Sequence, residues 1–152
     1  MITDRHLLLP ALATAIVILT SCNGNGLFPS NDPDPAGTVE AWVPVGGGIP
    51  FNGRYLTLTD QMLFRAGAIN QMEFSKGVSV NGLGSIKSIP KTNYAWWTEA
   101  VPGCGYVIHL TTDSFYGLME SWARLYVVGY TYTESRARNG VNVKYEINWW
   151  PN

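Results

Sequence analysis

The chain has 152 residues and a formal net charge of −1, and 14% of its residues are charged whereas 12% are aromatic. This length is enough for one modest domain. The ten Lys and Arg residues form no cluster of the kind that binds nucleic acid, and the composition argues against a disordered chain. We therefore expect one β-rich globular domain without a nucleic-acid partner.

The first 21 residues have the pattern of a secretory signal peptide. Arg5 and His6 precede the apolar run Leu7–Leu19, which as a helix would span only about 20 Å, less than the hydrocarbon core of a bilayer. A short apolar stretch behind a basic start is typical of a signal that is removed on export. The sequence therefore predicts an exported protein.

Cys22 directly follows this run. The sequence Leu19-Thr20-Ser21-Cys22 resembles the bacterial lipobox, in which an apolar residue and two small residues precede a lipidated cysteine. The resemblance implies cleavage before Cys22 and acyl chains on its thiol and its new amino terminus, each buried CH₂ adding about 0.8 kcal/mol of anchoring. The alternative is an ordinary signal peptide with an incidental cysteine. We expect a lipid-anchored protein of the cell envelope, facing the cell surface from the outer membrane.

Lipidation of Cys22 would rule out a disulfide with Cys104, the other cysteine of the chain. We expect the Cys104 side chain to be buried, and an intermolecular bridge is the alternative. Residues 22–37 are rich in Gly, Asn, Asp and Pro and predict a flexible tether that could reach roughly 40 Å. A single β domain is expected over residues 38–152.

From Thr38 onward the apolar pattern has a period of two, which predicts strands. The turn residues between the apolar runs include Asn-Gly pairs at 52–53, 81–82 and 139–140, which predict hairpins. Only Asp60–Ala68 and Ser114–Ala123 could form a helical turn. Seven to nine short strands favour an all-β fold, a small antiparallel sandwich or barrel. The expected strands are Thr38–Val43, Arg54–Thr59, Met62–Arg65, Gly77–Val80, Gly84–Ile89, Trp96–Val101, Gly105–Thr111, Trp122–Thr133 and Val141–Trp149.

The register of the last hairpin decides where three tyrosines point, because a slip of one residue exchanges the two faces of a strand. A tight turn at Asn139-Gly140 would place them in the core. A longer loop, with Thr133 opposite Val141, would turn them away from it, and we favour this register. The tyrosines are Tyr126, Tyr130 and Tyr132.

Five stretches of the chain carry a resemblance to a known family: Asp34-Pro35-Ala36-Gly37-Thr38-Val39, Gly82-Leu83-Gly84-Ser85-Ile86, Ser88-Ile89-Pro90, Val101-Pro102-Gly103-Cys104-Gly105-Tyr106-Val107 and Arg124-Leu125-Tyr126-Val127-Val128. In this order they resemble a family of small bacterial lipoproteins of unknown function, known mainly from Bacteroidetes. Gly117–Ala123 departs from the pattern as an insertion, and so does Cys104 between two glycines. The resemblance implies a surface-anchored β domain and supplies no catalytic residues.

Cys104 and His109 are the one pair that suggests a nucleophile and its base. Their odd spacing places them on opposite faces of a strand, so a packed thiol and a strand histidine are favoured. A pair of carboxylates such as Glu99 and Asp113 could assemble only in space. His109 is the sole histidine after the signal, and the acids resemble no calcium loop. We expect no metal, no cofactor and no enzymatic activity.

Aromatic residues are the remaining signal for function. Flat rings with a polar edge suit stacking on sugars and contacts at protein interfaces, although small β domains also use such rings as core. We expect a surface ligand-binding module with a glycan as ligand, and the alternative is an accessory subunit that docks onto another envelope protein. The candidate residues are Tyr94, Trp96, Trp97, Tyr126, Tyr130, Tyr132, Trp149 and Trp150.

Overall fold

The computed structural model describes residues 33–67, 71–91, 94–115 and 117–151. The predicted signal peptide, Cys22 and most of the predicted tether lie outside these residues. The described residues form eleven strands in two antiparallel sheets, so the all-β prediction is confirmed. Three of these strands have only two or three residues. Strands this short show no apolar alternation, so the sequence predicted fewer strands than the structure contains.

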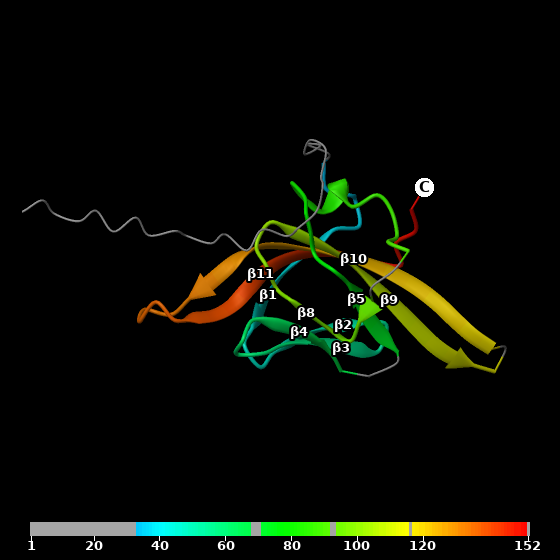
Figure 1. Ribbon diagram of the computed structural model, residues 1–152, viewed down its shortest axis with the longest axis horizontal. Coiled ribbons are helices and arrows are strands. Elements are labelled where there is room, and N and C mark those ends of the chain that lie inside the picture. Colours follow the sequence, from blue (N-terminus) through cyan, green and yellow to red (C-terminus); the bar gives the residue numbers. More distant parts are fainter. Residues whose placement is uncertain (1–32, 68–70, 92–93, 116, 152) are drawn as a thin grey trace, which may run out of the picture.

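The larger sheet, sheet A, contains in spatial order β1 (Val39–Pro44), β11 (Arg138–Ile147), β10 (Gly117–Tyr132), β9 (Cys104–Ser114), β5 (Met72–Ser75) and β7 (Tyr94–Ala95), and β6 (Val78–Ser79) also pairs with β9. Sheet B contains β2 (Gly48–Phe51), β3 (Arg54–Leu58), β4 (Leu63–Ala66) and β8 (Trp97–Glu99). Figure 1 shows sheet B lying across one face of the long strands β9, β10 and β11. The fold is therefore a two-layer sandwich.

The main core fills the space between the two sheets. Alternate residues of each strand point into it, as the period of two requires. From sheet A these include Ile108, Leu110 and Leu125, and from sheet B Leu56 and Phe64, all with 0% exposure. The other residues of each strand, which alternate with these, point to the outer faces of the sandwich.

The Asn-Gly pairs take three different structures. Asn52 and Gly53 have φ of 47° and 80° and connect β2 to β3 as the tight hairpin turn that the pair predicts. The pair at 81–82 precedes the short 3₁₀ helix η1 (Leu83–Ser85), so the strand expected at Gly84–Ile89 is wrong. The pair at 139–140 lies inside β11, so the tight turn that was the alternative to the favoured longer loop is wrong.

Ser114–Ala123, one of the two stretches that could have formed a helical turn, belongs instead to a long hairpin between β9 and β10. Its Leu, Met, Glu and Ala residues favour a helix locally, but pairing along β9 overrides that preference. The hairpin extends beyond sheet B (Figure 1). Strand β2 was not expected, because Pro50 and the neighbouring glycines suggested a connection; Pro50 fits there since β2 is an edge strand.

Strands β10 and β11 pair in neither expected register. The favoured pair of Thr133 with Val141 is wrong, since Val141 faces Tyr130. Val128 has no opposite residue, which makes it a β-bulge that shifts the parity of β10 by one residue. Tyr130 consequently packs against the main core, whereas Tyr126 belongs to a cluster on the other face of the sheet.

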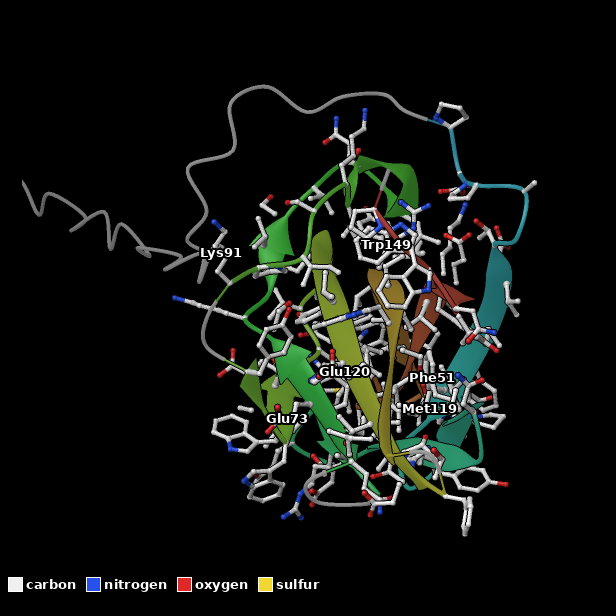
Figure 2. All side chains as sticks on the ribbon, turned by 90° about the vertical axis from the view of Figure 1, so that its right-hand side faces the viewer. Phe51, Glu73, Lys91, Met119, Glu120 and Trp149 are labelled. Carbon is white, nitrogen blue, oxygen red and sulfur yellow. The ribbon has the colours of Figure 1, made fainter. Side chains whose placement is uncertain are left out.

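This second apolar cluster covers part of the outer face of sheet A. It joins Leu83 and Ile86 of the η1 segment to Val107 of β9 and to Trp149 near the C-terminus. Trp149 lies toward the end of the sandwich opposite to Met119 of the long hairpin (Figure 2). The outer face of sheet A is therefore partly a second, smaller core.

Arg124 fastens this layer to β10. Its side chain is only 10% exposed, and its Nε donates a hydrogen bond to Glu146 Oε2 at 2.7 Å. Nη1 donates to the Ile86 carbonyl at 2.7 Å, and the guanidinium lies 5.1 Å from the centre of the Trp149 ring. One side chain thus holds the η1 segment, β11 and the C-terminal segment together.

We predict that Arg124→Ala lowers the free energy of unfolding by about 3 kcal/mol, because the Glu146 carboxylate would lose its partner in a mostly buried place. Urea unfolding measures this. Lys144→Ala, which removes the two surface ion pairs with Asp34 and Glu40, is the matched control and should have a small effect. Equal stability of the two variants would contradict the role given to Arg124.

Candidate functional site

A groove on the outer side of sheet B is the candidate site. It lies between the β3–β4 turn and β8 and has a volume of about 350 Å³. Two indoles and four polar side chains contribute to its walls. The lining residues are Thr59, Asp60, Gln61, Leu63, Arg65, Trp96 and Trp97.

Trp96 lies at a bend where the chain passes from sheet A to sheet B. The two residues before it form β7 of sheet A, and Trp97 begins β8 of sheet B. Neighbouring residues of a regular strand point to opposite faces, but the bend lets both indoles line the same groove. Trp96 is 37% exposed and Trp97 is 44% exposed.

Arg65 fixes the arrangement of the two indoles. It lies directly opposite Trp97 in the pairing of β4 with β8, and its guanidinium is 4.9 Å from the centre of the Trp96 ring. The Ala66 amide donates to the Trp96 carbonyl at 2.8 Å. The cation–π contact favours one orientation of the Trp96 ring by about 0.5–1 kcal/mol.

The facing wall is the β3–β4 turn, residues 59–62. The Thr59 hydroxyl accepts the Leu63 amide at 3.1 Å, and the Met62 amide donates to the Thr59 carbonyl at 3.1 Å. Met62 has a φ of 58° and a buried side chain, a conformation that costs about 1 kcal/mol or more and persists only where packing enforces it. Asp60 and Gln61 are therefore held outward on a rigid turn.

Tyr106 holds β8 in place from the other sheet. Its hydroxyl donates to the Glu99 carbonyl at 2.6 Å and accepts the Val101 amide at 2.9 Å, and its ring lies edge-on to Phe64. Burial raises the pKa of the Tyr106 phenol well above its usual range. The strand that carries Trp97 is thus fixed on one side by β4 and on the other by this phenol.

The other sequence candidates do not join the groove. Tyr94 packs edge-on against Trp122 and His109 on the outer face of sheet A, its hydroxyl donates to the Pro90 carbonyl, and burial raises its pKa to about 12. Trp149 is buried, and Tyr126 and Tyr130 pack in the clusters described above. Tyr132 and Trp150 are exposed, at 57% and 58%. Of the eight candidates, only Trp96 and Trp97 line this groove.

Sequence reasoning missed the polar side of the groove. Asp60, Gln61 and Arg65 belong to no motif, and only the pairing of β4 with β8 brings them to the two indoles. It also missed Tyr55, which is 58% exposed. Tyr55 lies on the outer face of sheet B, two residues along β3 from Thr57, which pairs with Arg65.

Cys104 and His109 lie on opposite faces of β9, as expected. Cys104 is 1% exposed in the main core, whereas the His109 ring stacks on Trp122 with a centroid distance of 4.3 Å. Cys104 is disulfide-bonded, so the expectation of a lone thiol at this position is wrong, whereas lipidation of Cys22 stays a prediction. The carboxylates Glu99 and Asp113, considered above as a possible pair, belong to different sheets: Glu99 to sheet B and Asp113 to sheet A.

Within the described segments, no three or more His, Cys, Asp and Glu side chains come together as metal ligands would. Nor does this part of the chain contain a helix with the length and apolar character needed to cross a bilayer. Comparison with protein-family models, with curated proteins and with solved structures gives no match.

We predict that stability falls as the pH rises above about 10. The raised pKa of Tyr106 means that the folded state keeps the phenol proton while the unfolded state loses it, so this contribution is complete below pH 10 and is lost at higher pH. Tyr106→Phe should cost about 1–3 kcal/mol at pH 8, because the Val101 amide loses its acceptor. It should also flatten the alkaline decline seen in urea unfolding between pH 8 and 11. An equally steep decline in the variant would refute this assignment.

Proposed function

We propose that this protein is a cell-envelope lipoprotein whose β domain binds glycans and does not transform them. The observation that carries the proposal is the groove in which the exposed rings of Trp96 and Trp97 meet Asp60, Gln61 and Arg65. Its volume of about 350 Å³ lies within the range of small-molecule sites, and an aromatic wall with a few polar groups is the usual composition of such sites.

The chemistry of the groove suits a sugar ring. The C–H face of a pyranose can stack on an indole, and its hydroxyl groups need both donors and acceptors at the rim. Gln61 offers both, Asp60 accepts and Arg65 donates. Because the turn and the indoles are already held in place, little conformational entropy is lost when a ligand binds.

The charges around the groove favour a neutral glycan. Asp60 is exposed and makes no side-chain hydrogen bond within the described residues, and Glu99 lies opposite Leu63, a lining residue. Arg65, the cation among the described lining residues, is engaged with the Trp96 ring. Two carboxylates beside one engaged guanidinium would repel sugars that carry acidic groups.

We predict that the full-length protein in detergent micelles binds neutral oligosaccharides on glycan arrays, and that Trp97→Ala weakens this binding about tenfold or more. Isothermal titration with the strongest array ligand measures the dissociation constants of the parent and the variant. Trp150→Ala, which removes an exposed indole outside the groove, is the control and should bind normally. Absence of binding on broad arrays, or equal loss in both variants, would count against the groove.

Lipid attachment at Cys22 rests on the lipobox resemblance and accounts for the exported β domain. Lys144 holds the start of the described chain against the sheet, since its Nζ is 2.6 Å from Asp34 Oδ2. The tether of an anchored protein would then end at Asp34. An acylated Cys22 thiol cannot take part in a disulfide, so anchoring and the disulfide form of Cys104 exclude each other within one molecule, since the sequence has no third cysteine.

We predict that cells expressing the protein incorporate a labelled fatty acid into it and that Cys22→Ser abolishes the label and leaves the unlipidated precursor. In the labelled protein, Cys104 should react with an alkylating reagent after denaturation without reductant. If the label persists in Cys22→Ser, lipidation of Cys22 is wrong; if Cys104 of the labelled protein reacts only after reduction, Cys104 is bridged to another molecule.

A second candidate function is docking onto another envelope protein. The tip of the β9–β10 hairpin exposes Phe115 at 98%, Leu118 at 61% and Met119 at 62%, and the hairpin extends past sheet B (Figure 1). Exposed apolar side chains gathered at one place favour a protein contact. If a folded protein bound no glycan on the arrays, docking would become the favoured function.

A further inference from the structure

A second groove lies on the outer face of sheet A, on the other side of the sandwich from the Trp96–Trp97 groove. It has a volume of about 420 Å³. Asp34, where the described tether meets the sheet, is bonded to Lys144 in its wall, and Figure 2 shows the first described residues entering at this end of β1. The lining residues are Glu40, Ala41, Trp42, Val128, Asn142, Val143 and Lys144.

The hollow is open because β10 presents no side chain opposite Asn142. Asn142 pairs with Trp42 on one side and with Gly129 on the other, and the bulged Val128 is displaced to the rim, where it is 47% exposed. A Cβ atom added to Gly129 would have no neighbour within 4 Å. The space beside Asn142 is therefore left by the absence of one side chain.

Nothing in the backbone requires glycine at position 129. Its φ lies outside the positive range, where L residues are strained, and no atom approaches too closely for a side chain. In a strand interior, glycine costs roughly 0.5–1 kcal/mol relative to residues with a side chain. The effect of this glycine is to keep the face beside Trp42 accessible.

Trp42 lines the groove, and its indole is held at its polar edge. Its side chain is 55% exposed, and its Nε1 donates to the Thr131 hydroxyl at 3.0 Å. The backbone of Gly140 packs closely against the same nitrogen, since a Cβ there would lie only 2.6 Å from it. The indole is thus fixed by its polar edge, and its apolar face remains available for stacking.

The charged part of the rim of this groove is slightly acidic. Lys144 Nζ is 2.6 Å from Asp34 and 3.1 Å from Glu40, so one ammonium group faces two carboxylates and the cluster has a net charge of −1. The Asn142 amide is exposed and has both a donor and an acceptor to offer. A fixed indole beside an amide and a slightly acidic ion cluster suits a neutral ring that has an apolar face and hydroxyl groups at its edge, and it would repel a ring that carries acidic groups.

We propose that the groove between Trp42 and Val128 is a second binding site for neutral pyranose sugars. The site stands on its own residues and does not depend on the Trp96–Trp97 groove. Occupied together, the two sites would lie on opposite faces of one small domain. A single protein could then hold two glycan chains, or two segments of one long chain, which raises avidity without any new contact.

Isothermal titration of the full-length protein in detergent micelles tests this proposal, with neutral hexasaccharides of glucose, mannose and xylose as probes. The Trp97→Ala protein should retain binding at the second groove. Adding Gly129→Ile, which fills the hollow without backbone strain, should abolish that residual binding, and adding Trp42→Ala should weaken it about tenfold or more. Thr112→Ile, which adds the same side chain at another exposed strand position, is the matched control and should bind as before.

The unfolding midpoint of Gly129→Ile should be equal to or higher than that of the parent, which separates a filled groove from a damaged fold. Residual binding that Gly129→Ile leaves intact would overturn the proposal, and so would the loss of all binding in Trp97→Ala alone. In the latter case the Trp96–Trp97 groove would still stand. If binding keeps its full strength in Trp97→Ala but is lost in Gly129→Ile, the result would support the second groove as a binding site and would contradict the first.

Discussion

The phenol of Tyr106 is the contact on which the groove of Trp96 and Trp97 depends. Strand β8 has three residues and one neighbour in its sheet, so its pairing with β4 alone is a weak constraint. Tyr106 reaches across the core from β9 and bonds to the carbonyl of Glu99 and the amide of Val101. A buried hydroxyl is costly unless it is paired. These bonds therefore fix the position of β8 relative to the core. Trp97 then lies opposite Arg65, and the bend between β7 and β8 places Trp96 in the same groove.

The two outer faces of the sandwich are used differently. Much of the face of sheet A carries a second apolar layer, which Arg124 fastens through Glu146, the η1 segment and the ring of Trp149. At the β1–β11 side of this face, the bulge at Val128 and the missing side chain of Gly129 leave a hollow instead. Among the residues that the structure describes, none forms such a cover on sheet B, and the outer side of this sheet carries exposed rings. Each face therefore combines a rigid support with an aromatic surface that reaches solvent.

The fold class follows from the sequence because alternation of apolar residues is a local property, and the turn at Asn52-Gly53 follows because both residues accept a positive φ. The second layer could not be predicted, since it depends on which loop returns over sheet A. Of the three tyrosines of β10, Tyr130 was placed on the wrong face, because the bulge at Val128 exchanges the two faces of the strand and cannot be recognised from the residue types. Trp96 and Trp97 were found as candidates by their composition alone. Asp60, Gln61 and Arg65 were not, because only strand pairing brings them to the indoles.

The central claim is that Trp96 and Trp97 form one preorganised sugar-binding surface, and the most direct measurement follows the six indole N–H signals of the chain by ¹H–¹⁵N NMR. The isotope-labelled full-length protein in detergent micelles is titrated with the neutral hexasaccharides. We predict that the signals of Trp96 and Trp97 shift together along one saturation curve, whereas those of Trp122 and Trp149, which are packed, stay in place. If neither groove indole shifts with any of these sugars, or if Trp122 and Trp149 shift as much as they do, the account is contradicted.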